Sequence, residues 1–258
     1  MTGISSWRLL EIEKNHAAMN MAIDEAILIS RSRCESPNTI RLYRWDPSAV
    51  SIGFFQSLRD EVDLETCKAE GVEVVRRITG GGAVFHDSLG EVTYSLITSE
   101  SESIMPQDIL GSYQVVCEGI IRGLKSLGVS ADFQPVNDVV VRGKKISGNA
   151  QTRRLGVMLQ HGTILVDADL EKMFRLLKVS DKKIRDKMIT SAEKRVTTLK
   201  NELGDRCSLD DVAKALVRGF QEALKITLKK GELSSSEIIR AETLAKEKYA
   251  NPEWTKRR

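Results

Sequence analysis

Apolar residues recur at helical spacing in several long segments of the chain. Residues 15–31 carry an apolar face made of Met19, Ala22, Ile23, Ala26 and Ile27. This spacing of three and four predicts an amphipathic helix, and residues 109–127 show the same period. A third helix is expected after Ser208, because Asp211 follows it at the spacing of a capping box. Further helices are expected at residues 62–70 and 236–249.

Short runs of β-branched and aromatic residues separate these helices and predict strands. The expected strands cover residues 39–45, 49–53, 72–78, 91–98, 137–142 and 156–166. The turn dipeptide Asp46-Pro47 separates the first two, which indicates hairpin-like neighbours. From residue 169 onward the pattern is mostly helical. This order predicts an α+β protein with a mixed or antiparallel sheet flanked by helices, rather than a regular βαβ series.

Composition narrows the class of protein further. The chain has 258 residues, of which 41% are hydrophobic, and a net charge of +3. Such a small charge gives no general electrostatic case for binding nucleic acid. No apolar run approaches the roughly 20 residues of a membrane span, and the first residues lack the apolar core of a signal peptide. We therefore expect a cytoplasmic protein, and the four irregularly spaced cysteines are expected to be reduced thiols rather than a zinc site or disulfide framework.

A glycine-rich segment follows the apolar run at residues 72–75. It contains two arginines, a threonine and three consecutive glycines, in the order Arg76-Arg77-Ile78-Thr79-Gly80-Gly81-Gly82. Backbone N–H groups without a neighbouring Cβ can converge on an anion, and a guanidinium adds a forked donor for phosphate oxygens. The segment could also be a tight turn between strands with solvated arginines. It matches neither a Walker P-loop nor a dinucleotide-binding fingerprint.

Two further segments combine polar residues with glycine. In residues 137–151, Gly143 is expected to form a hairpin turn, so that Lys144 and Lys145 point to opposite faces of the return strand. The inward lysine would need an anion, and Asp138 could hold a hard cation, although the segment taken alone fits an exposed hairpin tip better. His161 and Gly162 interrupt an apolar strand, where glycine marks a bulge or a close backbone approach. His161 could be a ligand-binding residue or a hydrogen-bonded core histidine.

Together these segments resemble the lipoate–protein ligase family, within the biotin and lipoate ligase fold, which is similar to class II synthetases. The matching residues are Arg76-Arg77-x-x-Gly80-Gly81-Gly82-Ala83-Val84-Phe85-His86-Asp87, Asn137-Asp138, Lys144-Lys145-Ile146-Ser147-Gly148-x-Ala150 and His161-Gly162-Thr163. Their order and spacing fit the family from the first helix to near Trp254.

The resemblance implies an ATP-dependent ligase that activates lipoate as lipoyl-AMP and transfers the lipoyl group to an acceptor lysine. Lys145 would be the catalytic residue, in contact with the α-phosphate and the acyl carbonyl. Asp138 would hold Mg²⁺. The nucleotide would contact Arg77 and the backbone of Gly82, Ala83, Val84 and Phe85. Small residues at Gly148 and Ala150 would leave room for the ligand, and His86, His161, Gly162 and Thr163 would line the acyl or adenylate pocket.

The octanoyltransferases of this fold transfer the acyl group without ATP, through a cysteine. Neither of the two regions that carry this cysteine, residues 129–135 and 166–179, contains one here. This absence favours the ligase, with the ATP-independent octanoyl or lipoyl transferase as the alternative. A biotin-type ligase or a non-catalytic lipoyl-adenylate-binding protein is a further alternative.

The resemblance also predicts domains and partners. We expect residues 1–258 to form a single catalytic domain, without the small C-terminal accessory domain of long-form ligases. A separate small accessory subunit would then supply it. The implied acceptors are the lipoyl domains of 2-oxo acid dehydrogenase E2 subunits and the glycine-cleavage H protein. No nucleic-acid or membrane partner is expected.

Overall fold

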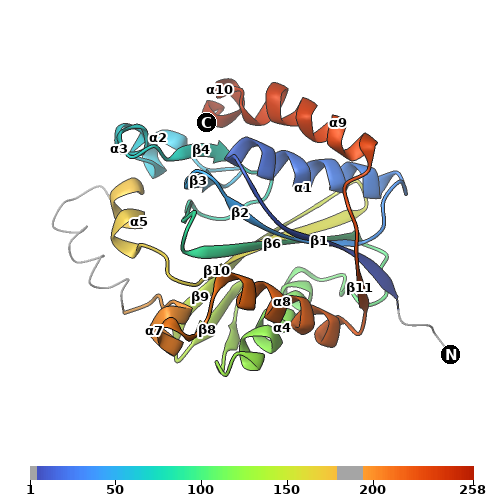
Figure 1. Ribbon diagram of the computed structural model, residues 1–258. Helices are drawn as coiled ribbons and strands as arrows, with labels where there is room; N and C mark the ends of the chain where they lie inside the picture. The colour runs from blue at the N-terminus through green and yellow to red at the C-terminus, as the bar shows by residue number, and fades with distance from the viewer. Residues whose placement is uncertain (1–4, 179–193) are drawn as a thin grey trace.

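A central β-sheet divides the molecule into layers (Figure 1). The computed structural model describes residues 5–178 and 194–258. Within them, eight strands form one sheet in the order β11 (Thr227–Lys230), β1 (Ser6–Asn15), β2 (Thr39–Trp45), β6 (Glu91–Ser99), β10 (Val157–Leu165), β9 (Lys144–Arg154), β8 (Asp138–Val141) and β7 (Asp132–Gln134). Strand β1 pairs parallel with β11 and β2, whereas the pairs from β2 to β7 are antiparallel. The sheet is therefore mixed, and the predicted α+β class is confirmed.

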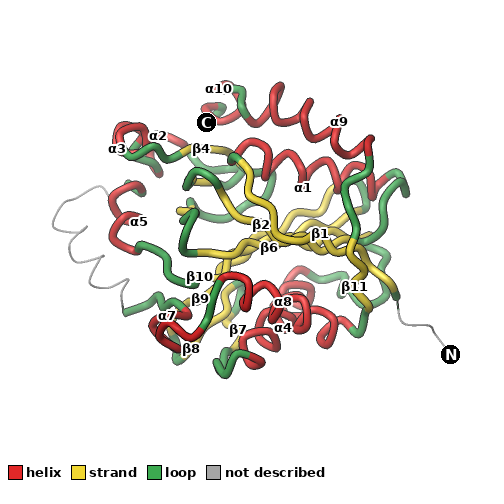
Figure 2. The backbone as a smooth tube through the Cα atoms, viewed as in Figure 1, coloured by secondary structure: helices red, strands yellow, loops and turns green. Residues whose placement is uncertain are grey.

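Helices cover both faces of this sheet (Figure 2). One face carries α1 (Ala17–Ser32), α9 (Ser235–Leu244), a π-helical turn (Ala245–Tyr249) and α10 (Pro252–Lys256). The other carries α4 (Ile109–Ser126) and α8 (Leu209–Leu224), with α7 (Leu199–Leu203) and a 3₁₀ turn (Gly204–Arg206) beside them. Each face has its own apolar cluster, since the buried stripes of α1 and of α4 and α8 pack on opposite sides of the strands.

Glycines allow α4 and α8 to pack backbone against backbone. A Cβ added at Gly219 of α8 would lie 2.1 Å from the carbonyl oxygen of Gly119 on α4. It would also lie 2.4 Å from the backbone nitrogen of Gly123. No side chain fits at this crossing without separating the helices, so glycine here determines how closely the layer packs.

A second, smaller sheet presents the glycine loop. It has the order β4 (Glu73–Arg76), β3 (Ala49–Ile52) and β5 (Val84–His86), and α2 (Leu58–Glu61), α3 (Leu64–Ala69) and α5 (Leu170–Leu176) lie against it. Strand β3 is parallel to β4 and antiparallel to β5. The chain must therefore turn back between β4 and β5, and residues 77–83 form this loop.

Most expected elements are present, with some differences. The helix expected at 236–249 is α9 followed by the π-helical turn, and α2 precedes the helix expected at 62–70. Strands β1, β5, β7 and β11 were not expected. The capping box of Ser208 and Asp211 is confirmed. Part of the helical region expected after residue 169 lies outside the described residues. Among the described helices, none is long and apolar enough to cross a membrane.

Candidate active site

The three segments singled out in the sequence meet at one pocket, which is open to solvent. Eleven of the thirteen predicted site residues line it, namely Arg77, Gly82, Ala83, Val84, His86, Lys145, Gly148, Ala150, His161, Gly162 and Thr163. Residues that were not predicted as site residues complete the lining, including Met21, Tyr43, Trp45, Ser51 and Asn149.

Phe85 and Asp138 are the two predicted residues outside this lining. Successive side chains in a strand point to opposite faces, so Val84 and His86 face the pocket while Phe85 packs in the core of the small sheet. Asp138 lies beside the pocket, where its Oδ1 is 2.6 Å from the Nζ of Lys145.

Arg77 holds the glycine loop from inside. Its two terminal nitrogens donate to the carbonyls of Gly80 and Gly82 at 2.7 Å each, and to the carbonyl and hydroxyl of Ser51 at 3.0 and 3.1 Å. Its Nε donates to the Thr79 hydroxyl at 3.1 Å. These bonds use all five guanidinium donors, so none is free for a ligand in this arrangement. Burial lowers the pKa of Arg77 to about 10, and the guanidinium remains charged at neutral pH.

Arg76 also donates to backbone carbonyls, but in segments other than the glycine loop. Its guanidinium is fully buried and donates to the carbonyls of Gly53, Phe54 and Gln56. It also donates to the carbonyls of Trp254 and Thr255 in α10. Arg76 ends β4 and Arg77 begins the loop, and these adjacent arginines hold two different segments.

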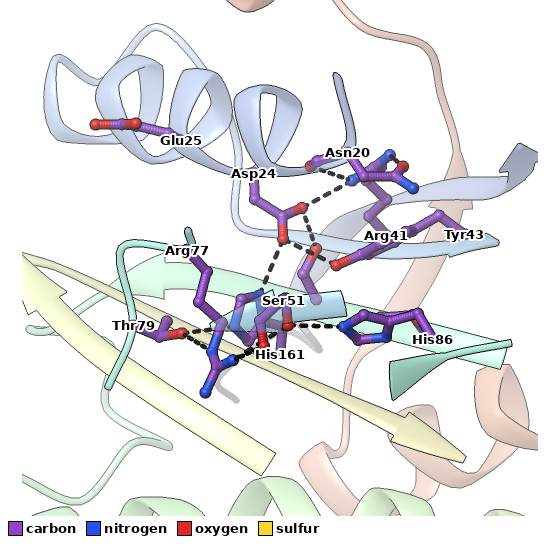
Figure 3. Close-up of polar contacts among 12 residues, drawn as sticks. Asn20, Asp24, Glu25, Arg41, Tyr43, Ser51, Arg77, Thr79, His86 and His161 are labelled. Atoms are coloured by element: carbon purple, nitrogen blue, oxygen red, sulfur yellow. Dashed lines mark hydrogen bonds and ion pairs between the residues drawn. The ribbon is translucent and has the colours of Figure 1, made fainter. Parts of the chain in front are cut away.

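A buried hydrogen-bond chain runs through the pocket wall (Figure 3). Asp24 of α1 bonds to Arg41 at 2.9 Å and to Ser95 at 2.8 Å, and its Oδ2 lies 3.3 Å from Nδ1 of His161. Nε2 of His161 is 2.7 Å from the Thr79 hydroxyl. Burial lowers the pKa of His161, which favours the neutral ring. Burial would raise the pKa of Asp24, but the bond to His161 and the charge of Arg41 outweigh it and lower that pKa.

A second histidine links a hydroxyl to a carboxylate. Nε2 of His86 lies 2.8 Å from Oγ of Ser51, and Nδ1 lies 2.8 Å from Oε1 of Glu91. The imidazole stacks on Trp45, with ring centroids 3.9 Å apart. Glu91 is fully buried, and its Oε1 also accepts from the Thr93 hydroxyl at 2.8 Å. The ring of His86 is therefore fixed on both edges and on one face.

Lys145 supplies the ammonium group of the pocket. Its side chain is 41% exposed and reaches back over Gly148, where an added Cβ would lie 2.6 Å from Cε and 2.7 Å from Nζ. The space at Gly148 is thus filled by the lysine itself, rather than left for a ligand. No group of three or more metal-binding side chains occurs among residues 5–178 and 194–258, and the expected Mg²⁺ ligand Asp138 is paired with Lys145.

Gly162 permits close contact between strands. A Cβ at this position would lie 2.1 Å from Oδ1 of Asn149 on the neighbouring strand. That oxygen accepts from the Tyr94 hydroxyl at 2.7 Å, and the Asn149 amide donates to the Asn137 carbonyl at 2.9 Å. The close approach expected at this glycine is therefore made by Asn149. This pocket residue occupies the unspecified position of the Lys-Ile-Ser-Gly-x-Ala motif.

The four cysteines lie outside the pocket lining. Cys67 and Cys117 are buried, and burial raises the pKa of these thiols to about 11 and about 12. Cys34 is exposed, and Cys207 is half-buried before α8. A thiol is a good nucleophile only as its thiolate, so neither buried cysteine is poised for catalysis.

Residues 16–221 match the family model of the lipoyl protein ligase A/B catalytic domain. The chain belongs to this family. The member from Kyrpidia tusciae named octanoyltransferase LipM is 43% identical over 99% of this chain and 100% of its own length. The octanoyltransferase LipM of Bacillus subtilis is 36% identical over 98% and 99%. Among solved structures, the bipartite lipoate protein ligase of Thermoplasma acidophilum, described with its E2 lipoyl domain, has a TM-score of 0.88. It is 35% identical and covers 98% of this chain and 96% of its own.

These relatives confirm the predicted family and fold but correct the predicted reaction. Curated members that match over nearly the full length, at 34–43% identity, are named octanoyltransferases rather than ligases. The predictions of an ATP-dependent ligase that forms AMP and pyrophosphate, and of ATP, Mg²⁺ and lipoyl-AMP as its ligands, were therefore wrong. The link to lipoylation stands.

Proposed function

We propose that this family member transfers an octanoyl group from a thioester donor to a lysine amine of a lipoyl domain, without ATP. The attacking nitrogen ends in an amide, the C–S bond breaks, and the thiol leaves. The full-length similarity to octanoyltransferases supports the reaction class. The observation that carries the proposal is a pocket with aromatic and aliphatic walls and one accessible ammonium, that of Lys145.

The residues divide this work between binding and charge stabilisation. Met21, Tyr43 and Trp45 offer apolar surface to a medium-length acyl chain. The Lys145 ammonium, released from Asp138, would stabilise the negative charge that develops on the acyl carbonyl oxygen. Asp138 keeps that ammonium in place before the substrate arrives. An acceptor lipoyl domain is the partner that this chemistry requires.

The test measures acyl transfer with and without nucleotide. The full chain is incubated with octanoyl-coenzyme A and a purified lipoyl domain, and the acceptor is followed by intact-protein mass spectrometry. We expect one octanoyl group to be added without ATP, and no stimulation when ATP and Mg²⁺ are added. Modification that requires ATP with free octanoate or lipoate, and fails with the thioester, would refute the proposal.

A further inference from the structure

The pocket places a serine, a histidine and a glutamate in the arrangement of a catalytic triad. Ser51, His86 and Glu91 are joined by two hydrogen bonds of 2.8 Å, and all three side chains are buried. Ser51 and His86 line the pocket, whereas Glu91 lies behind the ring. Such a set is recognised by geometry and roles rather than by sequence order. An acyl transferase whose pocket lining has no cysteine needs either direct attack by the acceptor or another nucleophile.

We propose that Ser51 is the nucleophile, and that it carries the acyl group as an ester between the thioester donor and the acceptor lysine. This assignment rests on the proposed acyl-transfer function. His86 acts as the general base, and Glu91 orients and stabilises its ring.

The hydrogen bonds fit this division of roles. When Nδ1–H of His86 donates to Glu91, the lone pair of Nε2 points at the Ser51 hydroxyl. Oε2 of Glu91 is buried and has no hydrogen-bond partner among the described residues. A buried carboxylate oxygen without a partner is costly, and the carboxylate of Glu91 stabilises the imidazolium that forms during the reaction. Proton transfer from Ser51 to His86 creates that charge.

Two further groups favour attack by the serine. The charged Arg77 donates to Oγ of Ser51 at 3.1 Å, which stabilises negative charge on that oxygen during attack. The N–H groups of Gly81 and Gly82 make no backbone hydrogen bond within the described part of the chain, and both residues line the pocket. They are available to the oxyanion, together with the Lys145 ammonium.

The two half-reactions balance. In the first, Oγ of Ser51 attacks the thioester carbonyl and its proton passes to Nε2 of His86. The C–S bond then breaks, and the leaving sulfur takes that proton. In the second, the neutral lysine amine attacks the ester, His86 accepts a proton from the nitrogen, and the C–O bond breaks. The Ser51 oxygen regains the proton from His86, which leaves an octanoyl amide.

The first experiment traps the ester in the absence of acceptor. The full chain is treated with 4-nitrophenyl octanoate or octanoyl-coenzyme A, digested and mapped by mass spectrometry. We expect one octanoyl group on Ser51, which Ser51→Ala abolishes and Ser51→Cys restores as a thioester cleaved by neutral hydroxylamine. Ser112→Ala, which alters a buried serine outside the pocket lining, should acylate like the wild type. An adduct only on cysteine or lysine, or none at all, would overturn the assignment.

Turnover then separates this assignment from the proposed function. With octanoyl-coenzyme A and lipoyl domain, Ser51→Ala should lose about 10³-fold in kcat or more, whereas Ser51→Cys should recover part of that loss. Active wild type together with equally active Ser51→Ala would leave the transferase in place and eliminate the serine. If Ser51 is acylated but the chain transfers nothing to the acceptor, the serine remains the nucleophile and the proposed transferase function is eliminated. Thermal unfolding of each variant separates loss of chemistry from loss of fold.

Discussion

Replacement of Gly53 by alanine would test whether the position of the glycine loop controls catalysis. Gly53 follows β3 directly, and a Cβ there would lie 2.1 Å from the carbonyl oxygen of Gly81. Real Cβ atoms essentially never approach closer than 3.0 Å, so the loop would have to move by about 0.9 Å. The loop cannot yield freely, because Arg77 holds the carbonyls on both sides, those of Gly80 and Gly82.

The expected cost follows from these contacts. Weakening one charge-assisted hydrogen bond to Arg77 costs roughly 1.5–3 kcal/mol, which lowers the melting temperature by several degrees in a chain of this size. A displacement near 1 Å at reacting groups lowers kcat/KM by about 10²-fold. The assay is octanoyl transfer to a lipoyl domain, with melting followed by circular dichroism. Gly80→Ala, where an added Cβ meets nothing within 4 Å, should have a much smaller effect. Transfer by Gly53→Ala within threefold of the wild type would refute this reasoning.

Three other predictions concern separate parts of the molecule. Lys145→Ala should lower kcat by about 10²-fold or more with little change in KM, since one oxyanion donor is lost; an unchanged kcat in steady-state transfer would contradict its role. Gly219→Ala should destabilise the fold by roughly 1–3 kcal/mol while kcat of the folded fraction is unaffected, because the α4–α8 contact lies outside the pocket; denaturant titration measures the loss. Burial would raise the pKa of Glu237, but hydrogen bonds from Arg8, Ser36 and the Ser234 backbone lower it to about 2. Its stabilising contribution of about 3 kcal/mol should therefore be complete above pH 4.5 and disappear as the pH falls toward 2. Glu237→Gln should flatten this part of the plot of unfolding free energy against pH. A Glu237→Gln plot like that of the wild type would contradict the stabilising role of Glu237.

Periodic patterns predicted the elements that bury one continuous face. The helix at residues 15–31 and the strand at 39–45 agree with α1 and β2 because their apolar spacing reflects direct contact with the core. Strand β11 escaped prediction because it lies at the sheet edge and three of its four residues are exposed, so burial leaves no alternation to detect. Strand β7 also escaped prediction, because it is short and largely exposed.

The pocket was predicted better than its chemistry. Glycine and lysine motifs identified the loop and the hairpin, since backbone approach and charge require those residue types. The acceptors of Arg77 could not be predicted, because a guanidinium suits a phosphate and a row of carbonyls equally. Ser51 lies in a short buried strand without a motif, and it meets His86 only through strand pairing. Ligases and transferases share the need for an acyl pocket and an ammonium, so these residues alone could not distinguish the reactions.

The back-to-back arrangement of Arg76 and Arg77 has a consequence for local opening of the structure. One guanidinium fastens α10 and the segment after β3, while the next fastens the glycine loop. The two guanidiniums belong to adjacent residues, Arg76 at the end of β4 and Arg77 at the start of the loop, so neither attachment can be released without disturbing the other. In native-state amide hydrogen exchange, the loop and the C-terminal helix should therefore open as one cooperative unit, with similar protection. Ligand bound in the pocket would then slow exchange in a helix that does not line it.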